Sequence, residues 1–187
     1  MGKICCFTGY RPHRFAFSPD GLRPEQVQEA LGTLIRSLYN EGYRTFISGM
    51  SAGVDLWAAA EVLLLRETAP TVELVAAVPF VGQESHWSIP LQREYRRILD
   101  GCQQVEYLFD EKEAAADPSS CYRRRNRWMV DRADTVVAVC ELDVADSRTG
   151  TASTVRYARR LQKRIFYIHP QTLAVTEETV QQIEFPL

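Results

Sequence analysis

Two segments of the chain combine glycines with hydroxyl side chains directly before a predicted helix. Residues 48–55 have the sequence Ser-Gly-Met-Ser-Ala-Gly-Val-Asp, and residues 147–154 have the sequence Ser-Arg-Thr-Gly-Thr-Ala-Ser-Thr. A glycine-bearing loop that leads into a helix presents backbone N–H groups to an anion, and the helix dipole strengthens the attraction. Both segments therefore predict contacts to a phosphate-containing ligand, from Ser48, Gly49, Ser51, Gly53, Gly150, Thr151 and Thr154.

Neither segment is a standard nucleotide motif. Residues 48–55 lack both the GxGxxG spacing and the lysine of the GxxxxGK[ST] loop. Asp55 adds a carboxylate, which repels phosphate, so we expect it to cap the helix or to accept a hydrogen bond from a ribose hydroxyl. A purely structural role remains the alternative, with Asp55 as one helix cap and Thr151 or Ser153 as another.

The loops after two other predicted strands add candidate contacts. Gly9 would let the backbone approach a ligand, and Arg11 would reach phosphate or carboxylate oxygens. Pro79 and Phe80 follow a third strand, where Phe80 or Trp87 could stack on a planar base. The alternative at residues 9–14 is a tight turn with exposed arginines.

An arginine-rich segment, residues 122–134, is predicted to be helical and offers two interpretations. It could form a stripe that binds nucleic acid. At helical spacing, however, most of its arginines would face water or pair with Asp131, while Trp128 and Met129 face inward. We therefore expect only Asn126 and Arg127 to lie near the ligand.

The sequence predicts no metal site and requires no cofactor. His86 has no second histidine at helical spacing, and no CxxC pair occurs among the five cysteines. Asp55 and Glu84 are the candidate catalytic carboxylates, although their spacing does not define a reaction.

These candidates must be positioned by alternating strands and helices. Short β-rich runs occur at residues 4–7, 45–48, 72–78, 104–109, 135–140 and 164–168, and helical patterns occur at 24–40, 55–67, 90–99, 121–133 and 151–162. Such alternation predicts an α/β fold with a Rossmann-like, doubly wound, mostly parallel sheet and helices on both faces. Ligands of such sheets bind beyond the carboxyl ends of the strands. Residues 110–120 are polar and are predicted to form a loop, a flap between a strand and the helix at residue 121.

Composition limits the class of protein. The 187 residues fit one domain, residues 1–187, with 45% hydrophobic and 25% charged residues and a net charge of -2. Acidic and basic residues therefore nearly balance, which argues against nucleic acid as a partner without excluding a local basic patch. The absence of a signal-peptide pattern, of an apolar run of roughly 18 residues and of a disulfide framework predicts a cytoplasmic protein that does not bind to a membrane.

The ordered set of segments resembles the YpsA-type family, which belongs with the LOG phosphoribohydrolases and DNA-processing protein A in one superfamily (SLOG). The similar segments are residues 7–12, 48–55, 79–80, 125–127 with 131–134, and 150–151. The strands and helices that carry these segments cover about residues 4 to 168, which is nearly the whole chain. The resemblance implies a crevice for a nucleotide-derived, ADP-ribose-like ligand. It also implies a link to bacterial cell division or stress. It supports Gly9, Arg11, Ser48, Gly49, Gly53, Asp55, Gly150 and Thr151 as site residues.

One departure from the LOG pattern bears on catalysis. LOG enzymes have a PGGxGTxxE motif whose glutamate serves in cleaving an N-glycosidic bond, whereas Thr154 occupies that position here. Whether the chain is an enzyme is left open. The leading hypothesis is a nucleotide-binding sensor or regulatory module; the alternatives are a phosphoribohydrolase-like enzyme and a single-stranded DNA-binding protein. A homodimer would fit domains of this type, by analogy alone.

Overall fold

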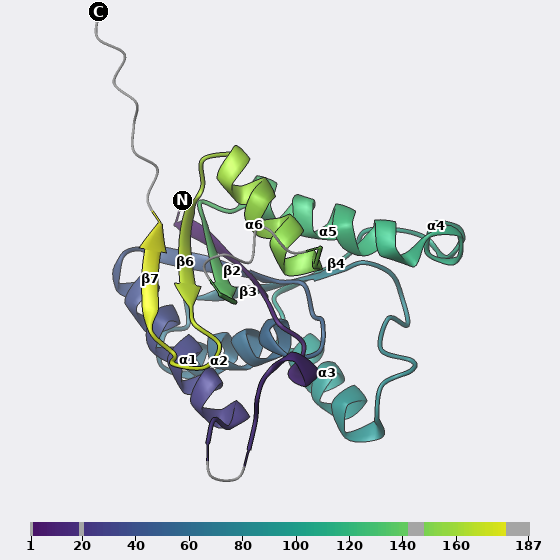
Figure 1. Cartoon of the computed structure of the whole chain (residues 1–187). Coiled ribbons are helices and arrows are strands. Elements are labelled where there is room, and N and C mark those ends of the chain that lie inside the picture. The colour runs from purple at the N-terminus through teal and green to yellow at the C-terminus, as the bar shows by residue number, and fades with distance from the viewer. Residues whose placement is uncertain (1, 19–20, 142–147, 179–187) are drawn as a thin grey trace, which may run out of the picture.

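The computed structural model describes residues 2–18, 21–141 and 148–178 and shows a sheet between two layers of helices (Figure 1). The strands are β1 (Lys3–Gly9), β2 (Tyr43–Ser48), β3 (Glu73–Val78), β4 (Gln104–Tyr107), β5 (Thr135–Val139), β6 (Arg164–Ile168) and β7 (Val175–Glu178). The helices are α1 (Pro24–Asn40), α2 (Val54–Thr68), α3 (Ile89–Gly101), α4 (Glu111–Ala116), α5 (Pro118–Arg132) and α6 (Gly150–Arg160), with a short 3-10 helix at Pro12–Arg14.

The sheet confirms the predicted doubly wound topology. Its seven strands have the order β4-β3-β2-β1-β5-β6-β7, and every neighbouring pair is parallel except β6 and β7. The chain adds strands on one side of β1 and then returns to place β5 on its other side. The connections after β1 and β5 therefore leave the sheet in opposite directions, and this is where such folds have a crevice.

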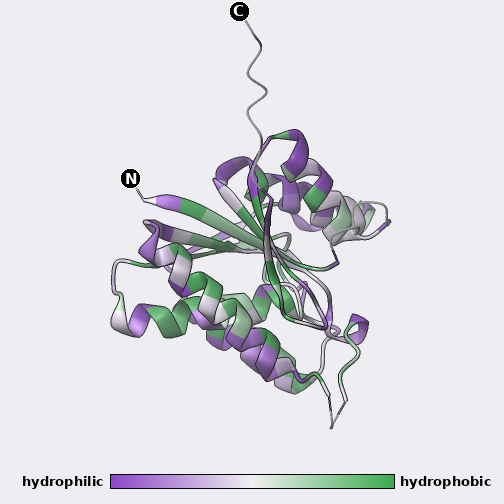
Figure 2. Cartoon of the chain, turned by 60° about the vertical axis from the view of Figure 1, so that its left-hand side comes forward, coloured by the Kyte–Doolittle hydropathy of each residue, from purple (hydrophilic) through white to green (hydrophobic). Residues whose placement is uncertain are grey.

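Hydrophobic patterning explains why these segments fold as they do. Along α1 the residues Val27, Leu31, Ile35 and Leu38 share one face and are completely buried, while Pro24 begins the helix. The strand β5 is apolar from Val136 to Val139 and buried at every position, as expected of a strand that is covered on both faces. Apolar residues accordingly concentrate on the strands and on the helix faces that pack against them (Figure 2).

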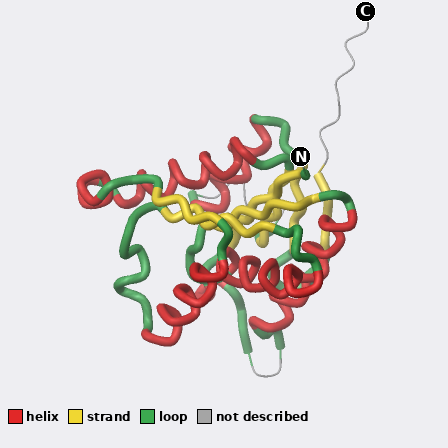
Figure 3. Tube along the Cα trace, turned by 180° about the vertical axis from the view of Figure 1, so that it is seen from behind, coloured by secondary structure: helices red, strands yellow, loops and turns green. Residues whose placement is uncertain are grey.

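The two helical layers are divided between the halves of the chain. Helices α1, α2 and α3 lie together on one face of the sheet, and α5 and α6 pack against each other on the opposite face (Figure 3). Within the described residues, no helix combines the length and the apolar composition that crossing a membrane requires.

Two segments differ from the sequence-based prediction. The predicted loop at residues 110–120 contains α4 and the start of α5, because Asp110 caps one helix and Asp117 caps the next. The strands and helices predicted from the sequence end at residue 168, whereas residues 175–178 form β7, an antiparallel edge strand. Each helix cap is a short polar signal that is easily mistaken for a loop.

Candidate functional site

A cavity of about 210 Å³ lies beyond the carboxyl ends of β1 and β5, at the position where the strand order reverses. Its walls come from the loop after β1, the loop before α2, one face of α5 and the start of α6. The lining residues are Thr8, Gly9, Tyr10, Arg11, His13, Arg14, Ser51, Ala52, Asp55, Tyr122, Arg125, Asn126, Thr149, Gly150 and Thr151.

Tight backbone packing holds the first wall in place. Gly53 has a φ of 96°, and a Cβ atom on it would lie 2.7 Å from the carbonyl oxygen of Tyr10. A Cβ atom on Gly9 would lie 2.6 Å from the side chain of Val54. Both glycines therefore permit the loop after β1 to pack on the start of α2, which is a structural contribution to the site.

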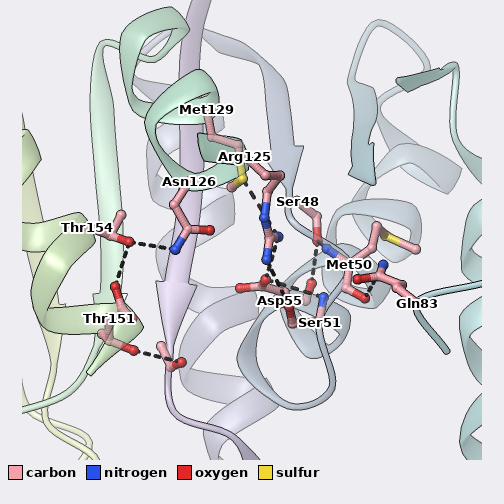
Figure 4. A network of polar contacts seen from close by, with 12 residues as sticks. Ser48, Met50, Ser51, Asp55, Gln83, Arg125, Asn126, Met129, Thr151 and Thr154 are labelled. Atoms are coloured by element: carbon pink, nitrogen blue, oxygen red, sulfur yellow. Dashed lines mark hydrogen bonds and ion pairs between the residues drawn. The ribbon is translucent and has the colours of Figure 1, made fainter. Parts of the chain in front are cut away.

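A buried ion pair crosses the floor of the cavity. Nη1 of Arg125 lies 3.2 Å from Oδ2 of Asp55, and the two side chains are only 4% and 11% exposed. Nη2 of Arg125 donates to Oγ of Ser51 at 2.9 Å, and the backbone N–H of Ser51 donates to Asp55 Oδ2 (Figure 4). The guanidinium thus joins α5 to the loop before α2.

Gly49 makes room for this ion pair. A Cβ atom at Gly49 would lie 1.2 Å from Nη1 of Arg125, so no other residue fits while the guanidinium keeps its position. Beneath it, Oγ of Ser48 donates to the carbonyl of Asp55 at 2.8 Å and accepts from the N–H of Met50. Ser48 is fully buried and serves the loop rather than the cavity.

Burial dominates the electrostatics of the pair. It raises the pKa of the Asp55 carboxyl, while Arg125 and the Ser51 N–H oppose that rise. Burial also lowers the pKa of the Arg125 guanidinium, which Asp55 opposes. Oδ1 of Asp55 makes no hydrogen bond within the described part of the chain, so the carboxylate keeps an acceptor for a hydroxyl group in the cavity.

The start of α6 forms the opposite wall. Thr149 caps the helix by accepting from the N–H of Ala152 at 3.1 Å. The N–H groups of Gly150 and Thr151 have no partner inside the helix, because the first turn of a helix lacks acceptors for them. A Cβ atom on Gly150 would meet nothing within 4 Å, so this turn is open to a ligand.

The threonine hydroxyls of α6 are already engaged. Oγ1 of Thr151 donates to the carbonyl of Gly9 at 3.0 Å, and Oγ1 of Thr154 donates to the carbonyl of Gly150 at 2.9 Å. Thr154 is 3% exposed and accepts from Nδ2 of Asn126 at 2.9 Å. Thr154 donates its single hydroxyl proton to the Gly150 carbonyl, so its oxygen can only accept a hydrogen bond from Asn126. Asn126 must therefore direct its NH₂ group at Thr154, and the Oδ1 atom of Asn126 remains as an acceptor.

Tyr122 and Tyr10 are the two aromatic rings of Phe, Tyr or Trp among the described residues that line the cavity, and Tyr122 is the one that α5 supplies. Phe80, which the sequence suggested for stacking, instead packs edge-on against Tyr122 with ring centroids 5.6 Å apart. The guanidinium groups of Arg11 and Arg125 each lie 5.9 Å from the centroid of the Tyr122 ring. Arg11 therefore lies beside the Tyr122 ring and lines the same cavity as the start of α6.

The structure sorts the predicted site residues into three groups. Those that line the cavity are Gly9, Arg11, Ser51, Asp55, Asn126, Gly150 and Thr151. Those that support its walls from behind are Ser48, Gly49, Gly53 and Thr154. Those that do not line it are Pro79, Phe80, Glu84 and Arg127, the last of which lies over the ring of Tyr157 at 5.5 Å. Ser147 lies outside the described residues.

Sequence reasoning missed Arg125, His13 and Tyr122. The sequence analysis places Arg125 with the arginines of its helix that face water or pair with Asp131. Its position gave a signal, because Cys121, Arg125 and Met129 repeat every four residues and form one buried stripe. An arginine on an apolar stripe requires a buried partner, and Asp55 supplies it.

Metal binding finds no support in the described residues, where no group of three or more His, Cys, Asp or Glu side chains could hold an ion. Hydrogen-bonding groups and arginines make up the polar lining instead. This arrangement can bind an anion at α6 and Arg11 and hydroxyl groups at Asp55 and Asn126.

The fold and the site together define a Rossmann-like domain with a polar crevice at its topological switch point. The model of the YpsA family, described as a SLOG family, matches residues 5–173, and the chain belongs to this family. This confirms the resemblance found in the sequence.

Relatives agree with that assignment, and one solved structure shares the fold. A UPF0398 protein of Halalkalibacterium halodurans is 29% identical over 142 residues, which cover 75% of this chain and 74% of that protein. The UPF0398 protein YpsA of Bacillus subtilis is 23% identical over 178 residues, covering 94% and 97%. DNA processing protein A of Helicobacter pylori, whose structure is described for its single-stranded DNA binding mode, matches with a TM-score of 0.54 and 18% identity. That match covers 89% of this chain, spans 65% of the other and shows a common fold.

Proposed function

We propose that the chain binds a nucleotide or nucleotide-derived small molecule in the cavity between β1 and β5, as a sensor or regulatory module. The observation that carries this proposal is the meeting of three groups in one cavity: the open first turn of α6, Arg11 and the Asp55 carboxylate. These groups match a phosphate and a sugar that are joined in one molecule.

Each part of a nucleotide would find its complement. A phosphate would accept hydrogen bonds from the N–H groups at the start of α6 and from Arg11. Ribose hydroxyls would donate to Oδ1 of Asp55 or Asn126, and a base would contact the ring of Tyr122. The structural role of several predicted residues, such as Thr154, is compatible with this because the backbone supplies the anion contacts.

A phosphoribohydrolase-like activity is favoured by one observation, the carboxylate of Asp55 in the cavity. Cleavage of a glycosidic bond benefits from such a carboxylate near the sugar. However, Oδ2 of Asp55 is held by Arg125 and Ser51, and the hydroxyl of Thr154 replaces the glutamate of the LOG motif. Binding is therefore the stronger proposal, and release of free base from monophosphates would instead support catalysis.

Single-stranded DNA is a second candidate ligand, because the Helicobacter pylori protein of the same fold is described as binding it. The arginines beside the cavity would attract its phosphates. A net charge of -2 provides no overall attraction for nucleic acid. Affinity for an oligonucleotide that falls steeply with salt would favour this candidate.

Gly150→Glu tests the main proposal. The open space at Gly150 accommodates a side chain, and a negative charge in the first turn stabilises a helix by about 0.3–1 kcal/mol. The same charge repels a phosphate, so we expect the affinity for a bound nucleotide to fall by about tenfold or more. Calorimetric titration with AMP, ADP-ribose, NAD and inorganic phosphate measures the effect.

Gly150→Gln is the matched control, because it has the same shape without the charge. It should weaken binding less than Gly150→Glu does. Equal loss in both variants would indicate a steric effect alone. The proposal is wrong if no nucleotide binds the unmodified chain more tightly than inorganic phosphate does.

A further inference from the structure

A second depression of about 500 Å³ adjoins the cavity. Five residues line both, namely Arg11, Tyr122, Asn126, Thr149 and Gly150. The two depressions therefore form one continuous surface, with Gly150 at their junction. We call the second part the arginine groove; it is lined beyond the shared residues by Ser119, Arg123, Arg148, Ser153 and Arg156.

The arginine groove differs from the cavity in its charge. With Arg11 included, four arginines line it, and no acidic side chain lies among the described residues that do so. The cavity, in contrast, contains the buried carboxylate of Asp55. One end of the continuous surface thus suits hydroxyl groups, and the other end suits anions.

Two helices also begin at the arginine groove. Ser119 lies in the first turn of α5, and Gly150 and Ser153 lie in the first turn of α6. The start of each helix carries a partial positive charge, which adds to that of the arginines. Asp117 is a counter-charge beside the groove: it caps α5 at Ser120 and pairs with Arg123 at 3.4 Å, with both side chains about half exposed.

We infer that the arginine groove is a second anion subsite, so that the ligand of this chain carries a further phosphate beyond the one held at α6. The chemical class is a nucleoside diphosphate or a derivative with a pyrophosphate bridge. This inference rests on the proposed function and specifies the ligand of that site. A small molecule fits better than a nucleic acid strand, because Tyr122 is the single aromatic residue lining the described part of the groove, and strand binding relies on repeated stacking.

The inference predicts that a second phosphate increases affinity. ADP should bind the unmodified chain about tenfold more tightly than AMP, since hydrogen bonds between charged partners are the stronger ones. The variant Arg123→Ala/Arg148→Ala should abolish this advantage for ADP and leave the affinity for AMP within about twofold. Calorimetry at constant ionic strength measures all four affinities.

Arg127→Ala/Arg132→Ala is the matched control. It removes the same charge from exposed arginines of α5 that lie over Tyr157 and Trp128, outside the groove. It should preserve the preference for ADP. A similar loss in the control would mean that general electrostatic attraction, rather than the groove, produces the preference.

Asp117→Asn provides a test in the opposite direction. Asparagine caps a helix as well as aspartate does, so α5 should remain stable. The substitution removes the counter-charge of Arg123, and we expect ADP to bind about threefold more tightly while AMP changes little. A role of Arg123 in helix stability alone would not produce this gain.

The possible results separate the two proposals. Equal affinities for AMP and ADP, unchanged in the groove variant, would overturn the second anion subsite and leave the proposed function intact. If no nucleotide binds, both are wrong. If an oligothymidylate binds with a steep salt dependence that the groove variant abolishes, and nucleotides do not bind, then the occupant is a nucleic acid strand and the inference fails.

Discussion

At the scale of single residues, the ion pair between Arg125 and Asp55 forms the floor of the cavity. It connects α5 to the loop before α2, and it requires the missing side chain at Gly49. Nε of Arg125 is buried and has no hydrogen-bond partner in the described residues. A guanidinium held in this way, at the floor of a cavity, positions the carboxylate of Asp55 for a ligand.

Arg125→Met should destabilise the fold strongly. Removing one member of a buried pair leaves an uncompensated charge on Asp55, which costs about 3–5 kcal/mol. Urea unfolding at pH 7 measures the change. Arg125→Met/Asp55→Asn should lose less than the two single variants combined, because no buried charge is left. Additive losses would contradict this coupling.

The pH dependence of Arg125→Met follows from the direction of the pKa shift of Asp55. Burial raises this pKa in the folded state, and the variant removes the arginine that opposes the rise. The folded state then binds a proton more tightly than the unfolded state, whose Asp pKa is about 3.9. The stability of the variant should therefore fall as pH increases from about 3.9 to the raised value, and level off above it. In Arg125→Met/Asp55→Asn this slope should be absent.

At the scale of secondary-structure elements, residues 110–120 show how a polar sequence can hide a helix. Asp110 accepts from the N–H of Glu113, whose carboxylate in turn accepts from the N–H of Asp110, so α4 begins with a reciprocal capping box. Arg124 of α5 pairs with Glu113 at 2.8 Å and lies 4.0 Å from the ring centroid of Phe109. The segment is a helix attached to α5.

Asp110→Ala should loosen α4. The loss of a helix cap costs about 1 kcal/mol, and a helix of six residues has little else to stabilise it. Hydrogen exchange at residues 111–116 should speed up, while exchange in α5 should not change. Asp110→Asn, which preserves the cap, is the control. Unchanged exchange in Asp110→Ala would show that packing alone maintains α4.

The prediction of elements from sequence succeeded where periodicity was strong. The predicted helix at residues 24–40 and strand at 164–168 match α1 and β6 residue for residue. The segment that became β7 contains Val175, Thr176, Glu177 and Glu178, which lack an apolar face. Its pairing depends on tertiary contacts, including the ion pair of Glu178 with Arg159 at 2.9 Å, and sequence periodicity does not show those.

At the scale of the whole molecule, the topology made the general position of the site predictable. Parallel strands place all their carboxyl ends at one edge, so glycine-bearing loops far apart in the sequence were expected to meet there. The exact lining was harder to predict, because it depends on side-chain direction. Arg125 and Arg127 are two residues apart on α5, yet one is buried against Asp55 and the other lies over Tyr157. Glycines at 49 and 53 proved to serve packing within the loops.

The same topology predicts how a ligand should stabilise the molecule. The cavity is lined by the β1–α2 half of the fold and by α5 and α6 of the other half, so a bound nucleotide connects the two halves. At a ligand concentration 100 times its dissociation constant, stability should rise by about 2.7 kcal/mol. For a chain of 187 residues this corresponds to an increase in melting temperature of roughly 5–10 °C.

Hydrogen exchange distinguishes this bridging from local binding. Residues 49–55 and 149–154 should become protected together when the nucleotide is added, because each segment contributes to the same cavity. In Gly150→Glu, which repels the phosphate and binds about tenfold more weakly, both protection factors should fall by about tenfold at that ligand concentration. Protection at only one of the two segments would contradict a ligand that spans the switch point, and would place it against a single half of the sheet.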